Sequence, residues 1–159
     1  LTAAVKEAVS GEKGVDLFAG CGTFTLPLAE HYEMIALESE KPMIAALDRG
    51  WREAKGLKKI EAVARDLFRR PFLPDDLAKL DFAVLDPPRA GAEAQVAELA
   101  KSEVAQIAYV SCNPVTFARD AKVLINAGYV LDWVQVVDQF RWSSHVELAA
   151  KLSRPHMQR

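Results

Sequence analysis

The sequence predicts an α/β domain built on a mostly parallel sheet, and three observations support this fold class. Short apolar runs alternate with stretches of helical periodicity along most of the chain. Such alternation is typical of parallel strands with helices on both faces of the sheet. Near the end, the runs at 129–137 and 145–151 follow one another without a helix between them, which predicts one antiparallel strand. Half of the 159 residues are hydrophobic, enough for one domain with a full core.

The fifth expected strand, at 104–110, and the helix after it are the best-marked pair of elements. The strand is a short, largely apolar run, and helical periodicity follows it. Asn113 can cap the helix, Pro114 suits its first position and Gly128 can end it. In chain order, the other strands are expected at 15–19, 34–38, 60–64, 81–85, 129–137 and 145–151. We assign 1–152 to the domain and 153–159 to a frayed tail.

Charge and cysteine content exclude several classes of protein. The formal net charge is −2, so the chain has no general attraction to phosphate backbones. Cys21 and Cys112 lack metal-ligand spacing, and neither a disulfide framework nor a zinc site is suggested. This usage fits a reducing cytoplasm. No run is apolar enough to cross a membrane and no signal peptide is present. The chain opens inside a predicted helix without an initiator methionine, which suggests an excised domain.

The first strand runs into a turn with Gly20 and Gly22, where the backbone can bend sharply and approach a ligand. A nicotinamide-type fingerprint would need a third glycine where Thr25 stands, which disfavours a dinucleotide. The turn alone is equally compatible with an ordinary strand–helix connection. Glu38 ends the second strand about 20 residues later, where an acidic side chain can accept hydrogen bonds from ribose hydroxyls. It can also be a solvated carboxylate.

The segment after the third strand holds an acid and a basic cluster. Asp66 is placed to bond an adenine amino group or to cap a turn, and the sequence does not separate the two. Arg65, Arg69 and Arg70 form the clearest basic cluster, which fits a solvated face better than an RNA contact.

Three further residues stand where chemistry is expected. Asp86 ends the fourth strand, and two prolines stiffen the chain after it. Cys112 lies between a strand and a helix N-terminus, where the partial positive charge favours a thiolate. Glu147 is a carboxylate on an otherwise apolar strand and shares a face with His145.

The order of elements is the pattern of a doubly wound methyltransferase domain, with predicted strand order 3-2-1-4-5-7-6. In open α/β sheets, ligands bind at the carboxyl ends of the strands. The glycine turn, Glu38, Asp66, Asp86 and Cys112 all fall at that edge, so the fold itself predicts that they cluster.

Four motifs, in this order, resemble the RNA uracil-C5 methyltransferases over nearly the whole chain. They are DLFAGCG at 16–22, DPPRAG at 86–91, SCNP at 111–114 with ARD at 118–120, and D-x-F at 138–140 with HVE at 145–147. The resemblance implies a Rossmann-like domain dependent on S-adenosylmethionine that methylates carbon 5 of a uridine in structured rRNA or tRNA. It also implies a cytoplasmic, monomeric protein.

The resemblance also implies roles for individual residues. Cys112 would be the nucleophile and Glu147 the general base, while Asp86 would lie between cofactor and target base and hold the uracil. The cofactor site would be lined by Phe18, Gly20, Gly22, Thr23, Glu38, Asp66 and Asp86. Phe140 or Trp142 could stack on a splayed base, although core packing is the expected role of at least one of them.

The chain departs from the family pattern at three points. Thr23 stands where the family usually has Asn, and Arg141 where it usually has Pro. The family's preceding RNA-binding and linker regions are absent, so we expect this chain to bind RNA weakly by itself.

Three other functions are weighed against this one. A methyltransferase for amino groups would carry an aromatic residue where Arg89 stands, and would leave Cys112 unexplained. A DNA cytosine-C5 enzyme would carry its cysteine after the fourth strand. A binding module without turnover would not need both Cys112 and Glu147, although truncation could also make the chain inactive.

Overall fold

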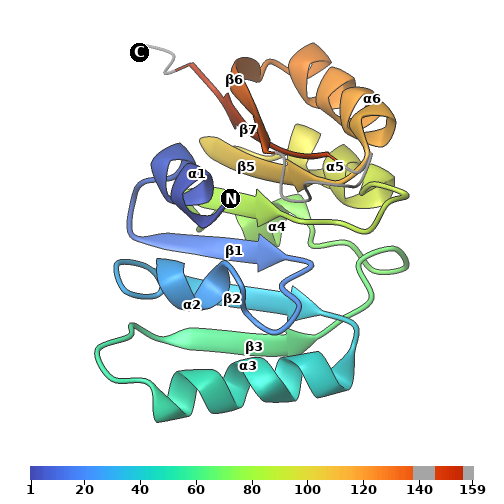
Figure 1. The fold of residues 1–159 in the computed structure, drawn as a ribbon. Helices are drawn as coiled ribbons and strands as arrows, with labels where there is room; N and C mark the ends of the chain where they lie inside the picture. The colour runs from blue at the N-terminus through green and yellow to red at the C-terminus, as the bar shows by residue number, and fades with distance from the viewer. Residues whose placement is uncertain (138–145, 156–159) are drawn as a thin grey trace.

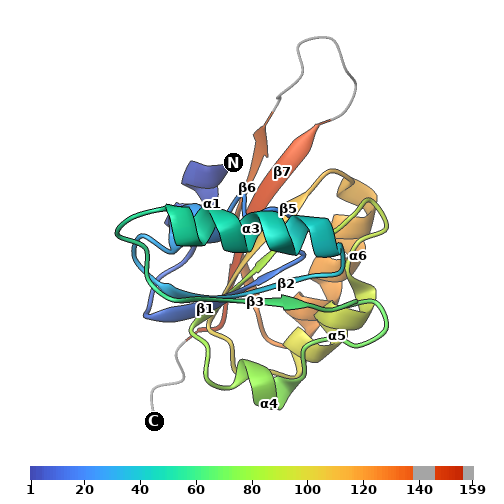
Figure 2. The same cartoon turned by 90° about the horizontal axis from the view of Figure 1, so that it is seen from below.

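Residues 1–137 and 146–155 are described by the computed structural model, and they form one twisted sheet covered by helices on both faces (Figure 1, Figure 2). The strands of the described part are β1 (Lys13–Leu17), β2 (Glu33–Glu38), β3 (Ile60–Ala64), β4 (Phe82–Leu85), β5 (Gln106–Ser111), β6 (Val130–Val137) and β7 (Glu147–Ser153). The helices are α1 (Thr2–Ala8), α2 (Thr25–Leu28), α3 (Lys41–Glu53), α4 (Pro74–Leu77), α5 (Glu93–Ala100) and α6 (Pro114–Asn126).

The sheet has the order β3-β2-β1-β4-β5-β7-β6, which confirms the predicted order and fold class. Strands β1 to β5 pair in parallel, whereas β7 runs antiparallel to both β5 and β6. The carboxyl ends of β1 to β5 therefore meet at one edge of the sheet, together with the amino end of β7.

Two hydrophobic cores, one on each face, hold this edge in place. On one face, α1, α2 and α3 cover the sheet and bury Leu28 and Leu47 (Figure 2). On the other face, α4, α5 and α6 bury Leu99 and Leu124 beside Tyr109 of β5. Because apolar side chains are buried on both sides, the central strands are apolar without alternation.

The helix after β5 begins as its residues predict. The Asn113 side chain caps α6 by accepting a hydrogen bond from Val115 N at 3.1 Å, and Pro114 follows at the first helical position. Gly128, with a φ of 106°, allows the chain to turn back after the helix. Cys112 therefore immediately precedes the capping residue of α6.

Most strand boundaries differ from the prediction by one or two residues, as in β5, which covers Gln106–Ser111 and not 104–110. Two differences matter most. The first strand ends at Leu17 rather than residue 19, because the backbone turns at Phe18 with a φ of 68°. The last strand covers Glu147–Ser153, so Ser153 belongs to the sheet and not to a frayed tail. No helix among the described residues is both long and apolar enough to cross a bilayer.

Arg154, also assigned to the tail, fixes the chain end to two helix C-termini. Its guanidinium donates hydrogen bonds to the carbonyl oxygens of Ala100, Ser102 and Ala127 at 2.8–3.1 Å. It also stacks over the ring of Tyr129, at 4.1 Å from the centroid. Carbonyl oxygens at a helix C-terminus have no hydrogen-bond donor within the helix, and a cationic side chain there can donate hydrogen bonds to them.

Arg154→Ala should therefore destabilise the domain. We expect the free energy of unfolding to fall by about 2 kcal/mol, since charge-assisted bonds and a cation–π contact are lost. For a chain of this size, that corresponds to a drop in Tm of about 4–8 °C, measurable by thermal denaturation. The matched control is Arg52→Ala, which removes an exposed pair with Asp48 on α3 and should leave Tm nearly unchanged. Equal Tm for the two variants would contradict the anchoring role.

Candidate active site

The turn between β1 and α2 contains two glycines, so it presents backbone atoms and not side chains at the edge of the sheet. Gly20 and Gly22 have φ values of 59° and 98°, a region that favours glycine. A Cβ atom at Gly22 would lie 3.0 Å from Leu47 Cγ, so this position is also closely packed. At Gly20 only Met43 Sδ comes within 4 Å of such an atom, at 3.9 Å. The turn is therefore open on the side of Gly20.

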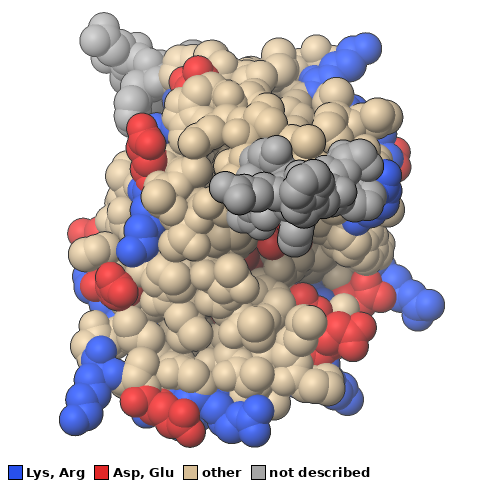
Figure 3. Space-filling model, in the orientation of Figure 1, with Lys and Arg blue, Asp and Glu red and all other residues tan. Residues whose placement is uncertain are grey.

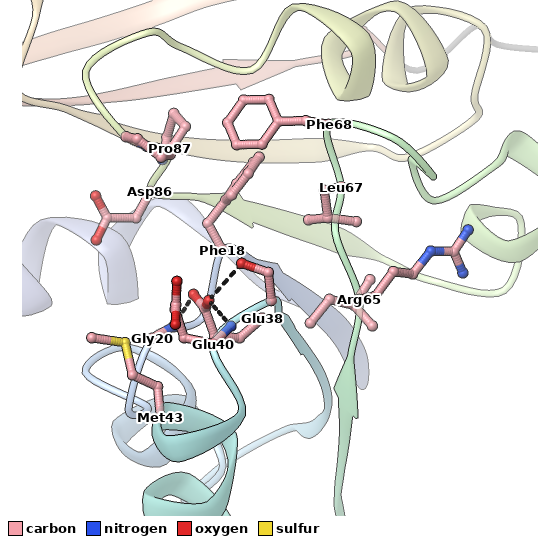
Figure 4. A pocket seen from close by; sticks show the side chains of 13 residues that line it. Phe18, Gly20, Glu38, Glu40, Met43, Arg65, Leu67, Phe68, Asp86 and Pro87 are labelled. Carbon is pink, nitrogen blue, oxygen red and sulfur yellow. Dashed lines mark hydrogen bonds between the residues drawn. The ribbon is translucent and has the colours of Figure 1, made fainter.

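A cavity of about 360 Å³, here called the glycine-turn cavity, opens beside this turn (Figure 4). It lies within the size range of small-molecule sites. Its apolar wall includes the rings of Phe18 and Phe68, whose centroids are 5.5 Å apart. The lining is Phe18, Gly20, Leu37, Glu38, Ser39, Glu40, Met43, Arg65, Leu67, Phe68, Asp86, Pro87 and Pro88. A flat apolar group and a polar or cationic group could both be held here.

Glu38 connects the glycine turn to the start of α3. Its Oε1 accepts a hydrogen bond from Gly20 N at 3.1 Å, and its Oε2 accepts one from Glu40 N at 2.8 Å (Figure 4). A carboxylate oxygen has more than one acceptor direction, so these bonds leave capacity for a ligand hydroxyl. Glu38 thus shapes the cavity and is also available at its wall.

The residues after β3 behave differently from the glycine turn. Asp66 does not line the glycine-turn cavity, and its Oδ1 accepts a hydrogen bond from Phe68 N at 2.9 Å, which caps a turn. Arg65 donates to the carbonyls of Arg70 and Pro71, both at 2.7 Å, and its guanidinium points away from the cavity (Figure 4). Arg65 therefore stabilises its own loop instead of forming an open basic cluster.

Asp86 lies between two hollows. It lines the glycine-turn cavity, and it also lines a second hollow of about 310 Å³, here called the Glu147 hollow. The lining of the Glu147 hollow is Leu1, Thr2, Thr23, Phe24, Asp86, Val110 and Glu147. A group bound in one hollow and a group bound in the other would meet at Asp86.

The acidic side chains near Asp86 affect its protonation. Its side chain is open to solvent, but surrounding protein removes part of its hydration. The loss of hydration is the main cause that raises the pKa of Asp86 to about 7, and the negative charge of the nearby Glu147 carboxylate is the second cause. Burial also raises the pKa of the neighbouring Asp16 to about 7. The hydrogen bond that Thr25 Oγ1 donates to Asp16 at 2.6 Å acts in the opposite direction and lowers this pKa. Asp16 Oδ1 has no hydrogen-bond partner within the described part of the chain.

Cys112 and Glu147 come together through the pairing of β5 with β7. Ser111, the last residue of β5, pairs with Leu148 in the antiparallel ladder. Cys112 follows Ser111 and Glu147 precedes Leu148, so both lie where this ladder ends. Cys112 is a free, partly exposed thiol. The thiol just after β5 and the carboxylate at the start of β7 thus lie at neighbouring strand ends. Glu147 lines the Glu147 hollow, whereas Cys112 lines neither hollow.

The structure brings most of the predicted site residues to one edge, but in two groups. Phe18, Gly20, Glu38 and Asp86 line the glycine-turn cavity. Thr23, expected there, instead lines the Glu147 hollow, and Gly22 lines neither. Positions 138–145 lie outside the described residues, and with them the predictions for Phe140, Arg141, Trp142 and His145.

Several lining residues were not predicted. Met43, Leu67 and Phe68 line the glycine-turn cavity, while Phe24 and Val110 line the Glu147 hollow. The sequence could have indicated these residues through their position, because each lies near the carboxyl end of a predicted strand or near the first turn of a helix. Among the described residues, no cluster of three or more His, Cys, Asp or Glu side chains could hold a metal ion.

Comparison with known proteins gives a consistent set of relatives. The family model described as tRNA (Uracil-5-)-methyltransferase matches residues 3–155. A Caulobacter vibrioides protein named "Uncharacterized RNA methyltransferase" is 53% identical over 151 residues, covering 95% of this chain and 36% of that protein. The Hahella chejuensis 23S rRNA (uracil(1939)-C(5))-methyltransferase RlmD is 39% identical, covering 89% of this chain and 33% of that protein. The chain thus spans about a third of the length of these relatives.

Solved structures agree with these relatives. The Pyrococcus abyssi tRNA (uracil-54, C5)-methyltransferase, in complex with S-adenosyl-L-homocysteine, superposes with a TM-score of 0.83 at 35% identity. The match covers 95% of this chain and 36% of that one. Synechocystis magnesium protoporphyrin IX methyltransferase shares the fold, with a TM-score of 0.74 at 15% identity, and covers 97% of this chain and 79% of that one. From the family match over residues 3–155, this chain belongs to the tRNA (uracil-5-)-methyltransferase family.

Proposed function

We propose that this chain methylates carbon 5 of a uridine in RNA, with S-adenosylmethionine as the methyl donor. The observation that carries the proposal is the meeting of Cys112 and Glu147 at the ends of β5 and β7, beside an aspartate that lines two hollows. Family membership adds support, since the Hahella chejuensis relative is named for carbon 5 of a uracil in 23S rRNA and the Pyrococcus abyssi structure for carbon 5 of a uracil in tRNA.

The glycine-turn cavity fits S-adenosylmethionine. Phe18 and Phe68 offer apolar faces for the adenine, and Glu38 can accept hydrogen bonds from the ribose hydroxyls. The carboxyls of Asp86 and Glu40 suit the positive charges of the cofactor. When bound, the cofactor supplies an electrophilic methyl group.

The Glu147 hollow fits the target base, and the residues around it match the chemistry. Carbon 5 of uracil is a poor nucleophile. Addition of the Cys112 thiolate to carbon 6 turns the ring into an enolate-like species, in which carbon 5 is nucleophilic. Once carbon 5 has gained the methyl group, Glu147 removes its proton. The bond between sulfur and carbon 6 then breaks and returns the electron pair to Cys112. Asp86 is placed to orient the pyrimidine at the border of the two hollows.

RNA binding needs more than this chain supplies. The formal net charge is −2. On the face seen in Figure 3, uncharged side chains predominate and charged ones lie mainly around the rim. Nucleic-acid affinity depends on neutralising phosphates, so we infer that tight RNA binding resides in regions that the longer relatives carry.

The decisive experiment is covalent trapping. A fluorine at carbon 5 cannot be removed as a proton, so RNA with 5-fluorouridine should remain bound to Cys112 through carbon 6 in the presence of S-adenosylmethionine. The adduct is detected as a slow band in denaturing gels and mapped by mass spectrometry. It should vanish in Cys112→Ser and persist in Cys21→Ser, the variant of the other thiol.

The trapping is performed with this chain and with a chimera in which it replaces the matching region of the Hahella chejuensis relative. That relative, on an RNA containing uracil 1939 of 23S rRNA, is the positive control. RNA with the 5-fluorouridine at position 54 of a tRNA tests the second substrate class. No adduct in either form, while the control is trapped, would refute the proposal. Methyl transfer that survives Cys112→Ala would indicate an amino target instead.

Glu147→Gln should separate methyl transfer from product release. Without a base to take the carbon 5 proton, the adduct with ordinary RNA should accumulate, and the rate of product release should fall by about 100-fold or more. Single-turnover assays with gel detection of the adduct measure both quantities. Glu53→Gln, an exposed acid on α3, is the control. Fast release without adduct by Glu147→Gln would remove Glu147 from the role of base.

Cofactor selectivity should depend on pH. Since the pKa of Asp86 is raised to about 7, its carboxyl is mostly neutral at pH 6 and mostly ionised at pH 8. Only the ionised form attracts the sulfonium, which S-adenosylhomocysteine lacks. Calorimetry should show that preference for S-adenosylmethionine over S-adenosylhomocysteine rises by about three- to tenfold over this range, or about 1 kcal/mol.

Asp86→Asn should flatten this dependence, whereas Asp75→Asn, an exposed acid on α4, should preserve it. A preference that does not change with pH in the unsubstituted chain would contradict the proposed contact of Asp86 with the cofactor charge.

A further inference from the structure

The segment that carries Asp86 is fastened to the start of α6. Asn113 Nδ2 donates a hydrogen bond to the Arg89 carbonyl at 3.1 Å. Thr116 Oγ1 lies 3.0 Å from the same oxygen and 3.2 Å from the Asn113 carbonyl, so its one proton is shared between these two acceptors. One residue further, Arg119 Nη2 donates to the Ala90 carbonyl at 3.0 Å. The first two turns of α6 therefore supply donors to two successive carbonyls. We refer to residues 86–92 as the Asp86 loop.

A buried carboxylate completes this attachment. Asp120 is only 1% exposed, and its Oδ2 accepts a hydrogen bond from Ala92 N at 2.8 Å. Its Oδ1 accepts from Arg119 Nη2 at 3.1 Å, and Tyr109 of β5 donates its hydroxyl proton to Oδ2. A buried charge is costly unless it is paired and fully hydrogen-bonded, and Asp120 meets both conditions.

The Asp86 loop is shaped to fit this attachment. Gly91 has a φ of 81°, and a Cβ atom there would lie 2.7 Å from Arg119 Nη2 and 2.9 Å from Asp120 Oδ2. A side chain at this position would push the loop away from α6. The close approach of backbone to Arg119 and Asp120 therefore requires glycine.

This attachment has a consequence for the two reacting segments. Cys112 immediately precedes Asn113, which caps α6 and holds Arg89. Asp86 begins the loop that Asn113, Thr116, Arg119 and Asp120 hold at its far end. The cysteine and the aspartate are thus attached to one hydrogen-bonded unit, although 26 positions separate them in the sequence.

We propose that Thr116 and Asp120 are positioning residues that fix Asp86 relative to Cys112. Neither side chain lines the glycine-turn cavity or the Glu147 hollow. They act through the Asp86 loop, and the inference rests on the proposed function for its catalytic consequence. Placing reacting groups is worth a large rate factor, so a small shift of this loop is costly.

The sharpest variant is Thr116→Val, which keeps the shape of the side chain and removes its hydroxyl. Thr116→Ser keeps the hydroxyl and is the rescue. Arg154→Ala is the control, because it removes hydrogen bonds at the C-terminal ends of α5 and α6, lowers stability, and leaves every contact between α6 and the Asp86 loop in place. The three variants are compared with the unsubstituted protein in the form found active in the trapping assay.

Kinetics provide the first measurement. Thr116→Val should lower kcat for methyl transfer by about tenfold and leave the KM for S-adenosylmethionine within about twofold, since geometry and not binding is lost. Thr116→Ser should restore kcat to within about twofold, and Arg154→Ala should keep it at that level. A kcat unchanged by Thr116→Val would overturn the proposal, as would an equal loss in Arg154→Ala.

Amide hydrogen exchange of residues 89–92 provides the second measurement, and it does not require activity. Thr116→Val should accelerate exchange of these amides by about tenfold, whereas Arg154→Ala should not, even if both lower Tm equally. Equal exchange in the two variants would overturn the link between the Asp86 loop and α6. If the unsubstituted protein shows no methyl transfer or trapping, the proposed function fails, and the exchange contrast still decides whether the link exists.

Discussion

The antiparallel pairing of β7 with β5 is the constraint on which the site depends. Because β7 runs against its neighbours, its first residue and not its last lies at the edge where β1 to β5 end. The ladder joins Gln106–Ser111 to Leu148–Ser153 over six residue pairs, which fixes Glu147 beside Cys112. A register slip of one residue would turn Glu147 to the opposite face, and a slip of two would move it by about 7 Å. Sheet register therefore decides whether thiol and carboxylate can act on one ring.

Asp86 connects the two halves of the site in space and in charge. It lies at the end of β4, in the middle of the sheet, with the glycine-turn cavity on one side and the Glu147 hollow on the other. Its carboxyl is close enough to Glu147 for the two charges to interact. A residue in this position can respond to ligands in both hollows, and the prolines that follow it limit how far it can move. Attachment of its loop to α6 extends this restriction to the segment that carries Cys112.

The sequence predicted backbone features more reliably than side-chain directions. The parallel sheet and its one antiparallel strand followed from the alternation of elements and from the missing helix before β7, whereas the strand order followed from the resemblance to methyltransferase domains. The cap of α6 followed from Asn113 and Pro114, since both act through local geometry. Whether Asp66 faced a ligand or a turn, and which hollow Thr23 would line, depended on loop conformation, which no periodicity encodes.

Two other differences have the same physical origin. Arg65 was grouped with surface arginines, but its carbonyl partners lie five and six residues further along a loop of unpredictable path. Arg154 was assigned to a tail, although it reaches carbonyls at 100, 102 and 127, contacts that exist only after the helices have packed. Both sets of hydrogen bonds depend on the folded path of the chain, over five and six residues for Arg65 and over 27 or more for Arg154, so neither can be found before the fold is known.

The acidic residues at the edge oppose folding and favour a cationic ligand. Asp16 and Asp86 have pKa values raised to about 7, from a usual 3.8. Between these values the folded chain binds more protons than the unfolded chain, so their contribution to stability is greatest at low pH and is lost as pH rises toward 7. A cation beside Asp86 reduces its part of this cost, because it favours the ionised carboxyl, whereas Asp16 is fully buried and lines neither hollow. Asp86 is therefore unfavourable in the free chain and favourable in a complex with a sulfonium, which gives a physical reason for an acid at this position.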